Sequence, residues 1–292
     1  MKKLVLVYNP VSGHAAMPKR LDPLIAAIQE RGMIVVPYRT QKGENAGFGA
    51  FIRAVEPDGI IAAGGDGTLH IVINLMMKHD IHLPLGIIGS GTSNDFATYL
   101  GITGDLGAYL DTIAAGRTRA VDLGLVDSTY FVNVASAGCM TGIAHEVDAR
   151  FKNRLGKLAY YIKGVSELPK FRPLPFHIRA DGEAFDVSAY FFVVVNSAVV
   201  GSMRHISDTI KVDDGLLDLL AVQSTNAREL IAISRNLFTG QPVDHFSSIL
   251  HLQAEAFHIS STVAMQGDLD GEAGPDLPMK IETIPQAIRI YC

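Results

Sequence analysis

The first 120 residues alternate short apolar runs with segments whose apolar residues recur at helical spacing. The runs at 4–8, 34–37, 59–63 and 85–88 are typical of buried parallel strands. The helical spacing follows these runs at three places: Leu21, Leu24, Ile25 and Ile28; Phe48, Phe51, Ile52 and Val55; and Thr68, Val72, Leu75 and Met76. Strands that alternate with helices predict a Rossmann-like α/β domain, with a parallel sheet covered on both faces.

The pattern changes near residue 122, after which strands dominate. They are predicted at 130–134, 176–179, 185–195, 216–222, 257–261 and 288–291. Two helices, at about 155–168 and 227–238, interrupt them. We therefore predict a first domain at 1–123 and a β-sandwich-like second domain at 124–292, with an extreme C-terminus that could pack back on the first.

Composition excludes several classes of protein. The chain has 292 residues, 48% of them hydrophobic, which suffices for two cores. Its net charge of -5 does not favour a nucleic-acid partner. No apolar run approaches the ~18 residues of a membrane span, and the first run stops at Asn9-Pro10, too early for a signal peptide. Cys139 and Cys292 have no metal-binding spacing, so we expect a reduced, cytoplasmic protein.

Three glycine-bearing turns follow strands of the first domain. They are Asn9-Pro10-Val11-Ser12-Gly13, Gly64-Gly65-Asp66-Gly67-Thr68 and Gly89-Ser90-Gly91-Thr92-Ser93-Asn94-Asp95-Phe96. The carboxyl ends of parallel strands line the ligand crevice, and glycine lets backbone N–H groups approach a phosphate. Three such loops suit a nucleotide polyphosphate. Ordinary turn chemistry explains the first loop equally well, but not the glycines around Asp66. Neither a Walker A sequence nor the protein-kinase motifs are present.

Carboxylates accompany these loops. Asp66, Asp95 and Asp122 each follow a strand or lie at the domain junction, where they could hold the Mg²⁺ that phosphoryl transfer needs. Two alternatives stay open. Asp95 or Asn94 could simply cap a helix, and Asp122 could belong to a turn.

Two further acidic segments lie in the second domain. Gly267-Asp268-Leu269-Asp270-Gly271-Glu272 contains an Asp-Gly pair, which is also a strong hairpin signal. Lys211-Val212-Asp213-Asp214-Gly215-Leu216 could be another hairpin or a small metal loop with oxygen ligands.

Three of these motifs, in this order, resemble the diacylglycerol kinase catalytic-domain family, and in particular its soluble bacterial lipid kinases. They are Gly64-Gly65-Asp66-Gly67-Thr68, Gly91-Thr92-Ser93-Asn94-Asp95-Phe96-Ala97 and Asp270-Gly271-Glu272. The segments 9–13, 122–124, 131–138 and 155–160 also fit, so the resemblance runs from residue 4 to about 290. It implies an ATP-binding α/β domain, a β-sandwich lipid-binding domain and a cleft between them.

The resemblance also implies roles for individual residues. The implied nucleotide contacts are Asn9, Pro10, Ser12, Gly13, Thr40, Gly64, Gly65, Asp66, Gly67, Thr68, His70, Thr92 and Asn94. Asp66, which also counts as catalytic, would hold an Mg²⁺–water network with Asp95 and Asp122. Glu272 would be the general base, supported by Asp270. A structural Mg²⁺ would lie at Asp214 and the backbone carbonyls of Lys211 and Leu216.

The implied reaction is ATP- and Mg²⁺-dependent transfer of the γ-phosphoryl group to a lipid hydroxyl, giving phosphatidic acid if the acceptor is diacylglycerol. The motifs handle phosphate and metal, not acyl chains, so the acceptor stays open. An NAD kinase and a non-catalytic nucleotide or lipid sensor are the alternatives. Homodimers are common among such enzymes, although the sequence does not reveal the oligomeric state.

A basic segment at 150–172 predicts peripheral contact with an anionic membrane, at the inner surface. Its basic residues are Arg150, Lys152, Arg154, Lys157, Lys163, Lys170 and Arg172, and Glu167 is its only acidic residue. Each basic residue near an anionic surface contributes about 1 kcal/mol, which salt weakens. A solvated helix with an inward apolar stripe is the alternative reading.

Overall fold

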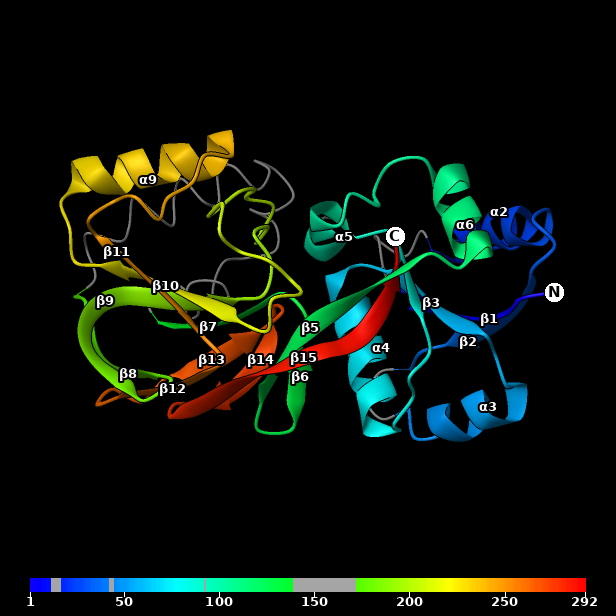
Figure 1. The fold of residues 1–292 in the computed structure, drawn as a ribbon, viewed down its shortest axis with the longest axis horizontal. Coiled ribbons are helices and arrows are strands. Elements are labelled where there is room, and N and C mark those ends of the chain that lie inside the picture. The colour runs from blue at the N-terminus through cyan, green and yellow to red at the C-terminus, as the bar shows by residue number, and fades with distance from the viewer. Residues whose placement is uncertain (12–16, 42–44, 92, 139–171) are drawn as a thin grey trace. The chain divides into compact units, whose positions relative to one another are not determined.

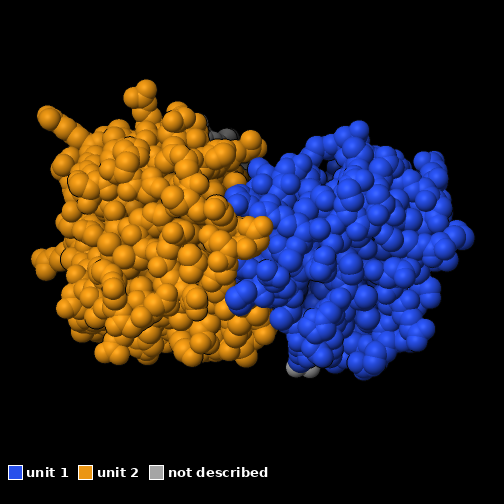
Figure 2. Space-filling view, in the orientation of Figure 1, with its two compact units in different colours: residues 1–123, 285–292 blue, residues 124–284 orange. Residues whose placement is uncertain are grey.

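The computed structural model describes residues 1–11, 17–41, 45–91, 93–138 and 172–292. The chain forms two compact units, which Figure 2 colours separately: residues 1–123 with 285–292 make unit 1, and residues 124–284 make unit 2. Two strands, β5 (Thr118–Val126) and β15 (Met279–Tyr291), contribute residues to both units (Figure 1).

Unit 1 contains a parallel sheet in the order β4-β3-β1-β2. Its strands are β1 (Lys3–Tyr8), β2 (Ile34–Arg39), β3 (Gly59–Gly64) and β4 (Leu85–Gly89). Every residue of β3 is buried, as expected for a central parallel strand covered on both faces. The predicted α/β architecture of the first domain is confirmed.

Helices cover both faces of this sheet. α2 (Met17–Gln29) and α6 (Leu106–Ala115) lie on one face, while α3 (Phe48–Val55) and α4 (Asp66–Lys78) lie on the other (Figure 1). Side chains alternate along β1, so that Leu4 and Leu6 pack with residues of α2 and α6. A short helix, α5 (Asp95–Tyr99), follows β4.

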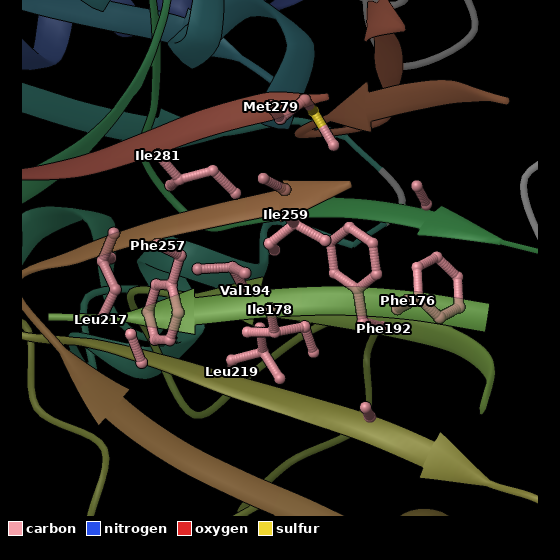
Figure 3. Packing of buried hydrophobic residues seen from close by; sticks show 14 of the residues in the cluster. Phe176, Ile178, Phe192, Val194, Leu217, Leu219, Phe257, Ile259, Met279 and Ile281 are labelled. Atoms are coloured by element: carbon pink, nitrogen blue, oxygen red, sulfur yellow. The ribbon is translucent and has the colours of Figure 1, made fainter. Parts of the chain in front are cut away.

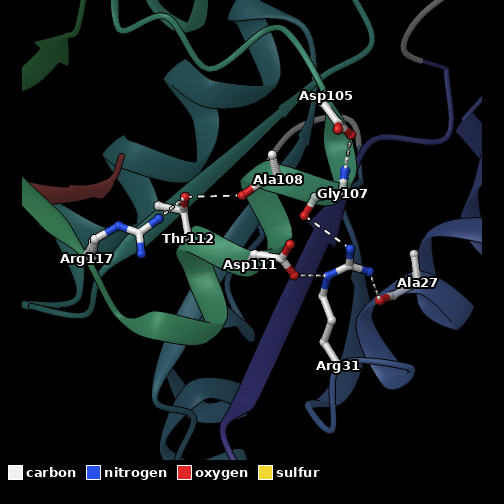
Figure 4. Close-up of polar contacts among 8 residues, drawn as sticks. All are labelled: Ala27, Arg31, Asp105, Gly107, Ala108, Asp111, Thr112 and Arg117. Atoms are coloured by element: carbon white, nitrogen blue, oxygen red, sulfur yellow. Dashed lines mark hydrogen bonds and ion pairs between the residues drawn. The ribbon is translucent and has the colours of Figure 1, made fainter.

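Arg31, just beyond α2, ties that helix to α6 (Figure 4). Its Nε donates to Asp111 Oδ1 (2.6 Å), while its other nitrogens donate to the carbonyls of Ala27 (2.9 Å) and Gly107 (3.2 Å). Asp105 caps α6 by accepting the Gly107 N–H (2.7 Å). Because the Asp111 side chain is 65% exposed, the ion pair adds little stability, and its main effect is to orient the two helices.

Residues 285–292 complete the core of unit 1. Ile290 pairs with Leu85 of β4 in parallel, and Tyr291 is 1% exposed within the same core cluster as Leu4. Asp122, which is wholly buried in β5, accepts the backbone N–H of Gln286 at 2.7 Å. This carboxylate therefore holds the returning strand and does not form a turn.

Unit 2 is built of antiparallel strands around one long strand, β9 (Glu183–Val195), which pairs with β8, β7 and β10. The others are β6 (Thr129–Phe131), β7 (Val134–Gly138), β8 (Leu174–Ala180), β10 (Leu217–Gln223), β11 (Ile249–Ala254), β12 (Ala256–Ser261), β13 (Gln266–Leu269) and β14 (Glu272–Asp276). Helix α9 (Ala227–Thr239) follows β10. The core is shown in Figure 3, where Phe176 and Phe192 meet edge to face with ring centroids 5.3 Å apart.

Two predicted strands differ from the observed ones. The run at 130–134 is split into β6 and β7, because the amides of residues 132 and 133 bind a side chain and do not continue a strand. The run at 288–291 is only the end of β15. The predicted helix at 155–168 and the basic segment, apart from Arg172, lie outside the described residues. Within the described ranges, no helix is both long and apolar enough to cross a membrane.

Candidate functional site

Two glycine loops of unit 1 lie in direct backbone contact. The Ser90 N–H donates to the Gly64 carbonyl at 2.8 Å. A Cβ added to Gly91 would lie 2.6 Å from the Cα of Gly65, and one added to Gly65 would lie 3.0 Å from the Cα of Gly91. Neither glycine has a positive φ. Glycine is needed at these two positions because the loops pack too closely for any side chain.

Asp66 joins the same two loops through its carboxylate. Its Oδ2 accepts the N–H of Asn94 and its Oδ1 accepts the N–H of Asp95, both at 2.9 Å. These N–H groups open helix α5, and the Asn94 side chain makes no capping bond there. The start of α5 is therefore capped by a residue of another loop, and Asp95 itself is 7% exposed.

The Asn94 side chain also makes hydrogen bonds within its own loop, residues 89–96. The residue adopts a left-handed conformation, with φ 50° and ψ 48°. Its Oδ1 accepts the N–H of Gly91 and its Nδ2 donates to the carbonyl of Gly91, both at 3.0 Å. With the Asp66 bonds, these contacts make the two loops one connected body.

Replacing Gly91 by Ala is expected to lower the free energy of unfolding by about 1–3 kcal/mol, because the added methyl must push the backbone of Gly65 aside. Thermal unfolding measures the loss. Gly47→Ala is the control, since a Cβ there meets no atom within 4 Å, and we expect a change below about 0.5 kcal/mol. Equal melting temperatures for the two variants would contradict the close packing of the loops.

Of the other predicted nucleotide residues, Asn9, Pro10 and Thr40 follow strand ends of unit 1, and Thr68 and His70 lie on α4. Asn9 follows β1 and accepts the Val11 N–H at 3.1 Å, which forms a turn that contains Pro10. Thr40 is 3% exposed, and its Oγ1 donates to the Tyr8 carbonyl at 3.3 Å. Thr68, also 3% exposed, follows Gly67 on α4. His70 lies on the same helix, whereas Ser12, Gly13 and Thr92 lie outside the described residues.

A cavity of about 500 Å³ lies beside the glycine loop at 89–96. Its walls include Lys19 and Arg20 from α2, Ser90 and Asn94 from the loop, and Tyr109 from α6. Burial raises the pKa of the Tyr109 phenol above its usual value, so this side chain is neutral. The loop at 89–96 was expected here from the sequence, and it contributes Gly89, Ser90 and Asn94 to the walls. Lys19 and Arg20, which lie on α2, were not singled out from the sequence.

The metal-binding prediction has a limited structural counterpart. Among the described residues, no three His, Cys, Asp or Glu side chains gather into a ligand set. Asp66 and Asp95 are neighbours through the bond between the Asp66 carboxylate and the Asp95 amide, and both offer the hard oxygens that Mg²⁺ prefers. Asp122 makes its observed contact with Gln286. Asp66 and Asp95 therefore bring together two carboxylates of the kind that Mg²⁺ prefers, and metal binding here stays a prediction.

In unit 2, the Asp270-Gly271 pair forms the turn of the β13–β14 hairpin, in which Leu269 pairs with Glu272. Both turn residues have positive φ, 53° and 91°, as a type I′ turn requires. Asp268 accepts the Gly271 N–H at 2.9 Å. Glu272 is exposed at the first position of β14.

The Asp270 carboxylate is anchored by three consecutive backbone amides. It accepts the N–H groups of Val132 (2.9 Å), Asn133 (2.9 Å) and Val134 (3.0 Å). The Asp270 N–H in turn donates to the Val134 carbonyl at 2.8 Å. Consecutive amides that converge on one anion form a nest, and here the nest holds the tip of the hairpin at the start of β7.

Unit 2 contains a second Asp-Gly-Glu turn, Asp181-Gly182-Glu183, which joins β8 to β9. Asp181 and Gly182 have φ 46° and 94°, close to the values at Asp270 and Gly271. The Asp181 carboxylate accepts the N–H groups of Glu255 (3.0 Å) and Ala256 (2.9 Å). The tripeptide and its turn geometry therefore do not by themselves mark a catalytic site.

The acidic segment at 211–216 forms a turn that leads into β10 and not a hairpin. Asp214 accepts the N–H of Leu216 at 3.1 Å, and Gly215 has a φ of 78°. Lys211 and Asp214 are exposed, so the loop is open to solvent.

Comparison with known proteins covers both units. The family model described as the diacylglycerol kinase catalytic domain matches residues 3–126, and the one described as the YegS C-terminal NAD kinase beta sandwich-like domain matches residues 133–292. The latter agrees with the predicted β-sandwich-like second domain.

Named relatives match over nearly the whole chain. A diacylglycerol kinase of Bacillus subtilis is 33% identical over an alignment that covers 99% of this chain and 96% of the relative. One of Staphylococcus epidermidis is 33% identical over 99% of this chain and 92% of its own. The crystal structure of a diacylglycerol kinase from Bacillus anthracis superposes with a TM-score of 0.77 at 26% identity, covering 99% of this chain and 96% of that one.

Proposed function

Since the chain belongs to the diacylglycerol kinase family, whose members are kinases with an alcohol as acceptor, we propose that it transfers the γ-phosphoryl group of ATP to the hydroxyl of diacylglycerol. The products are phosphatidic acid and ADP. The observation that carries this proposal is the joined pair of glycine loops in unit 1, which Asp66 holds together at the carboxyl ends of β3 and β4.

Unit 1 supplies the nucleotide site in this proposal. Backbone amides of the close-packed loops and the start of α4 suit a polyphosphate. Asp66, Asp95 and Asp122 are the carboxylates that would hold Mg²⁺ through water, and the ion would neutralise phosphate charge when bound. Because Asp66 also fixes the relative position of the two loops, the same side chain couples metal binding to the shape of the phosphate site.

Unit 2 supplies the general base. Glu272 accepts the proton of the lipid hydroxyl, whose oxygen then forms a bond to the γ-phosphorus while the bond to the ADP oxygen breaks. Asp270 is half-buried, and its two oxygens bind three amides of the nest. Its role is to place the turn, and with it Glu272. The exposed position of Glu272 suits a base that must meet a lipid.

The structural Mg²⁺ stays a proposal for the loop at 211–216. Asp214 would provide a carboxylate oxygen, and Lys211 and Leu216 would provide carbonyls. Its contribution would be to rigidify the turn that precedes β10.

A direct assay tests the reaction. The purified protein is incubated with γ-labelled ATP and Mg²⁺, in separate mixtures with diacylglycerol, phosphatidylglycerol, ceramide or NAD. We expect label in phosphatidic acid. Label in another lipid would replace diacylglycerol as the acceptor, label in NADP would favour the NAD kinase alternative, and no transfer to any acceptor would favour a sensor.

A further inference from the structure

We infer that Asn133, Asn196 and Ser197 form a buried polar network that positions the proposed general base, Glu272. This inference rests on the proposed function, because it assigns these side chains to the placement of Glu272. They act through the backbone and the turn, so they are positioning residues and not catalytic ones.

The side chains of Ser197 and Asn133 are bound to each other, and the Asn196 side chain is bound to the segment that holds Asp270. Asn196, which is wholly buried, donates from Nδ2 to the Val132 carbonyl at 3.0 Å. Asn133, 6% exposed, donates from Nδ2 to the Val199 carbonyl at 2.9 Å. The wholly buried Ser197 hydroxyl donates to Asn133 Oδ1. The backbone N–H of Asn196 also donates to the Asn133 carbonyl at 2.9 Å.

These bonds fix the peptide groups that make the nest. The amides of Val132, Asn133 and Val134 all point at the Asp270 carboxylate. The asparagines hold the carbonyl of Val132 and the side chain of Asn133, so this segment cannot rotate without breaking a buried hydrogen bond. If these amides moved, the Asp270 carboxylate and the turn at 270–271 would move with them. Glu272 would then be displaced as well, because it pairs with Leu269 across this turn.

Burial of two amides and a hydroxyl is costly unless each finds partners, whereas apolar side chains would fill the same space without that cost. Hence we infer that the role of this network is to orient the amides that bind Asp270. The second Asp-Gly-Glu turn supports the assignment by contrast. There the carboxylate of Asp181 is exposed and so is its partner Glu255, while Val132 and Asn133 at the nest are buried. The same turn is thus anchored on a buried polar support only where the base is proposed.

The test is a matched pair of Ser→Ala variants in unit 2. Ser197 is wholly buried and donates to Asn133, whereas Ser207 is 1% exposed and donates to Asp244. Each variant removes one buried hydroxyl that donates to an oxygen of a side chain. We expect both to lower the melting temperature similarly. Only Ser197→Ala should lower kcat, by at least about tenfold, with the KM for ATP changed less than about twofold.

Hydrogen exchange provides a readout that needs no activity. The amides of residues 132–134 should exchange faster in Ser197→Ala and at the wild-type rate in Ser207→Ala. Ser197→Cys keeps the side-chain shape with a weaker donor, so it carries the same test if the Ala variant does not fold.

Equal kcat in the two Ala variants, or unchanged exchange at 132–134 in Ser197→Ala, would overturn the network's positioning role. Failure of the proposed function is separate, because in that case the wild type itself would phosphorylate no lipid. Faster exchange in Ser197→Ala with an inactive wild type would leave the network as an anchor for Asp270 and remove its link to a base.

Discussion

Replacing Glu272 by Gln is expected to slow phosphoryl transfer about 10²–10⁴-fold while ATP–Mg²⁺ still binds normally. Gln has nearly the same shape as Glu, but its amide cannot accept the proton of a lipid hydroxyl, and loss of a general base has an effect of this order. Initial rates with diacylglycerol in mixed micelles measure the turnover. A calorimetric titration with the nucleotide measures the binding.

The chain provides a closely matched control in Glu183→Gln. Glu183 follows the same Asp-Gly pair, begins a strand after the same kind of turn, and is likewise exposed. Its replacement should leave kcat unchanged. If both variants lose activity equally, the effect is not specific to Glu272. If Glu272→Gln weakens ATP binding at an unchanged kcat, Glu272 is a nucleotide ligand and the assignment as base is wrong.

Asp66→Asn is expected to reduce activity by at least about 10²-fold and to destabilise unit 1 as well. The Asp66 carboxylate accepts two backbone N–H groups, one on each oxygen, whereas Asn has a single acceptor and would turn an N–H donor toward one of them. An amide of Asn94 or Asp95 would lose its partner, which costs about 1–3 kcal/mol. Activity assays and denaturant unfolding measure the two effects.

Asp105→Asn is the control for Asp66→Asn. Asp105 also caps a helix in unit 1, but it does so with one hydrogen bond and at an exposed position. Asn and Asp are nearly equivalent caps, so stability and activity should both stay close to wild type. Near-normal activity in Asp66→Asn would remove Asp66 from the mechanism. A loss of activity that only follows the fraction of unfolded protein would leave it a structural role alone.

Local pattern predicted the parallel half of the fold well and parts of the antiparallel half poorly. The runs that became β1, β3 and β4 are continuous and apolar, because parallel strands are buried on both faces. β14 reads Glu-Ala-Gly-Pro-Asp and carries no strand signal of its own. It exists because β13 pairs with it across a tight turn, and such tertiary support is invisible in a short window of sequence.

At the candidate site, residue types were predictable but their partners were not. The glycines and carboxylates stood out by composition and position. The amides that Asp66 binds are 28 and 29 residues away, and those that Asp270 binds are 136 to 138 residues away. No periodicity connects positions so far apart. Asn133, Asn196 and Ser197 lie within or beside apolar runs that read as strands. A polar residue at such a place usually marks the end of a strand, so the sequence does not show that these three are buried and bound to the nest.

The return of residues 285–292 to unit 1 constrains how a nascent chain can fold. The ribosome releases these residues after all of unit 2, so Ile290 and Tyr291 are absent while unit 1 emerges. Until then β4 is an unpaired sheet edge, and the space that Tyr291 fills is unoccupied. Domains usually fold in the order of synthesis, but here the first unit is finished last. A fragment ending at residue 123 would therefore be an incomplete and aggregation-prone domain.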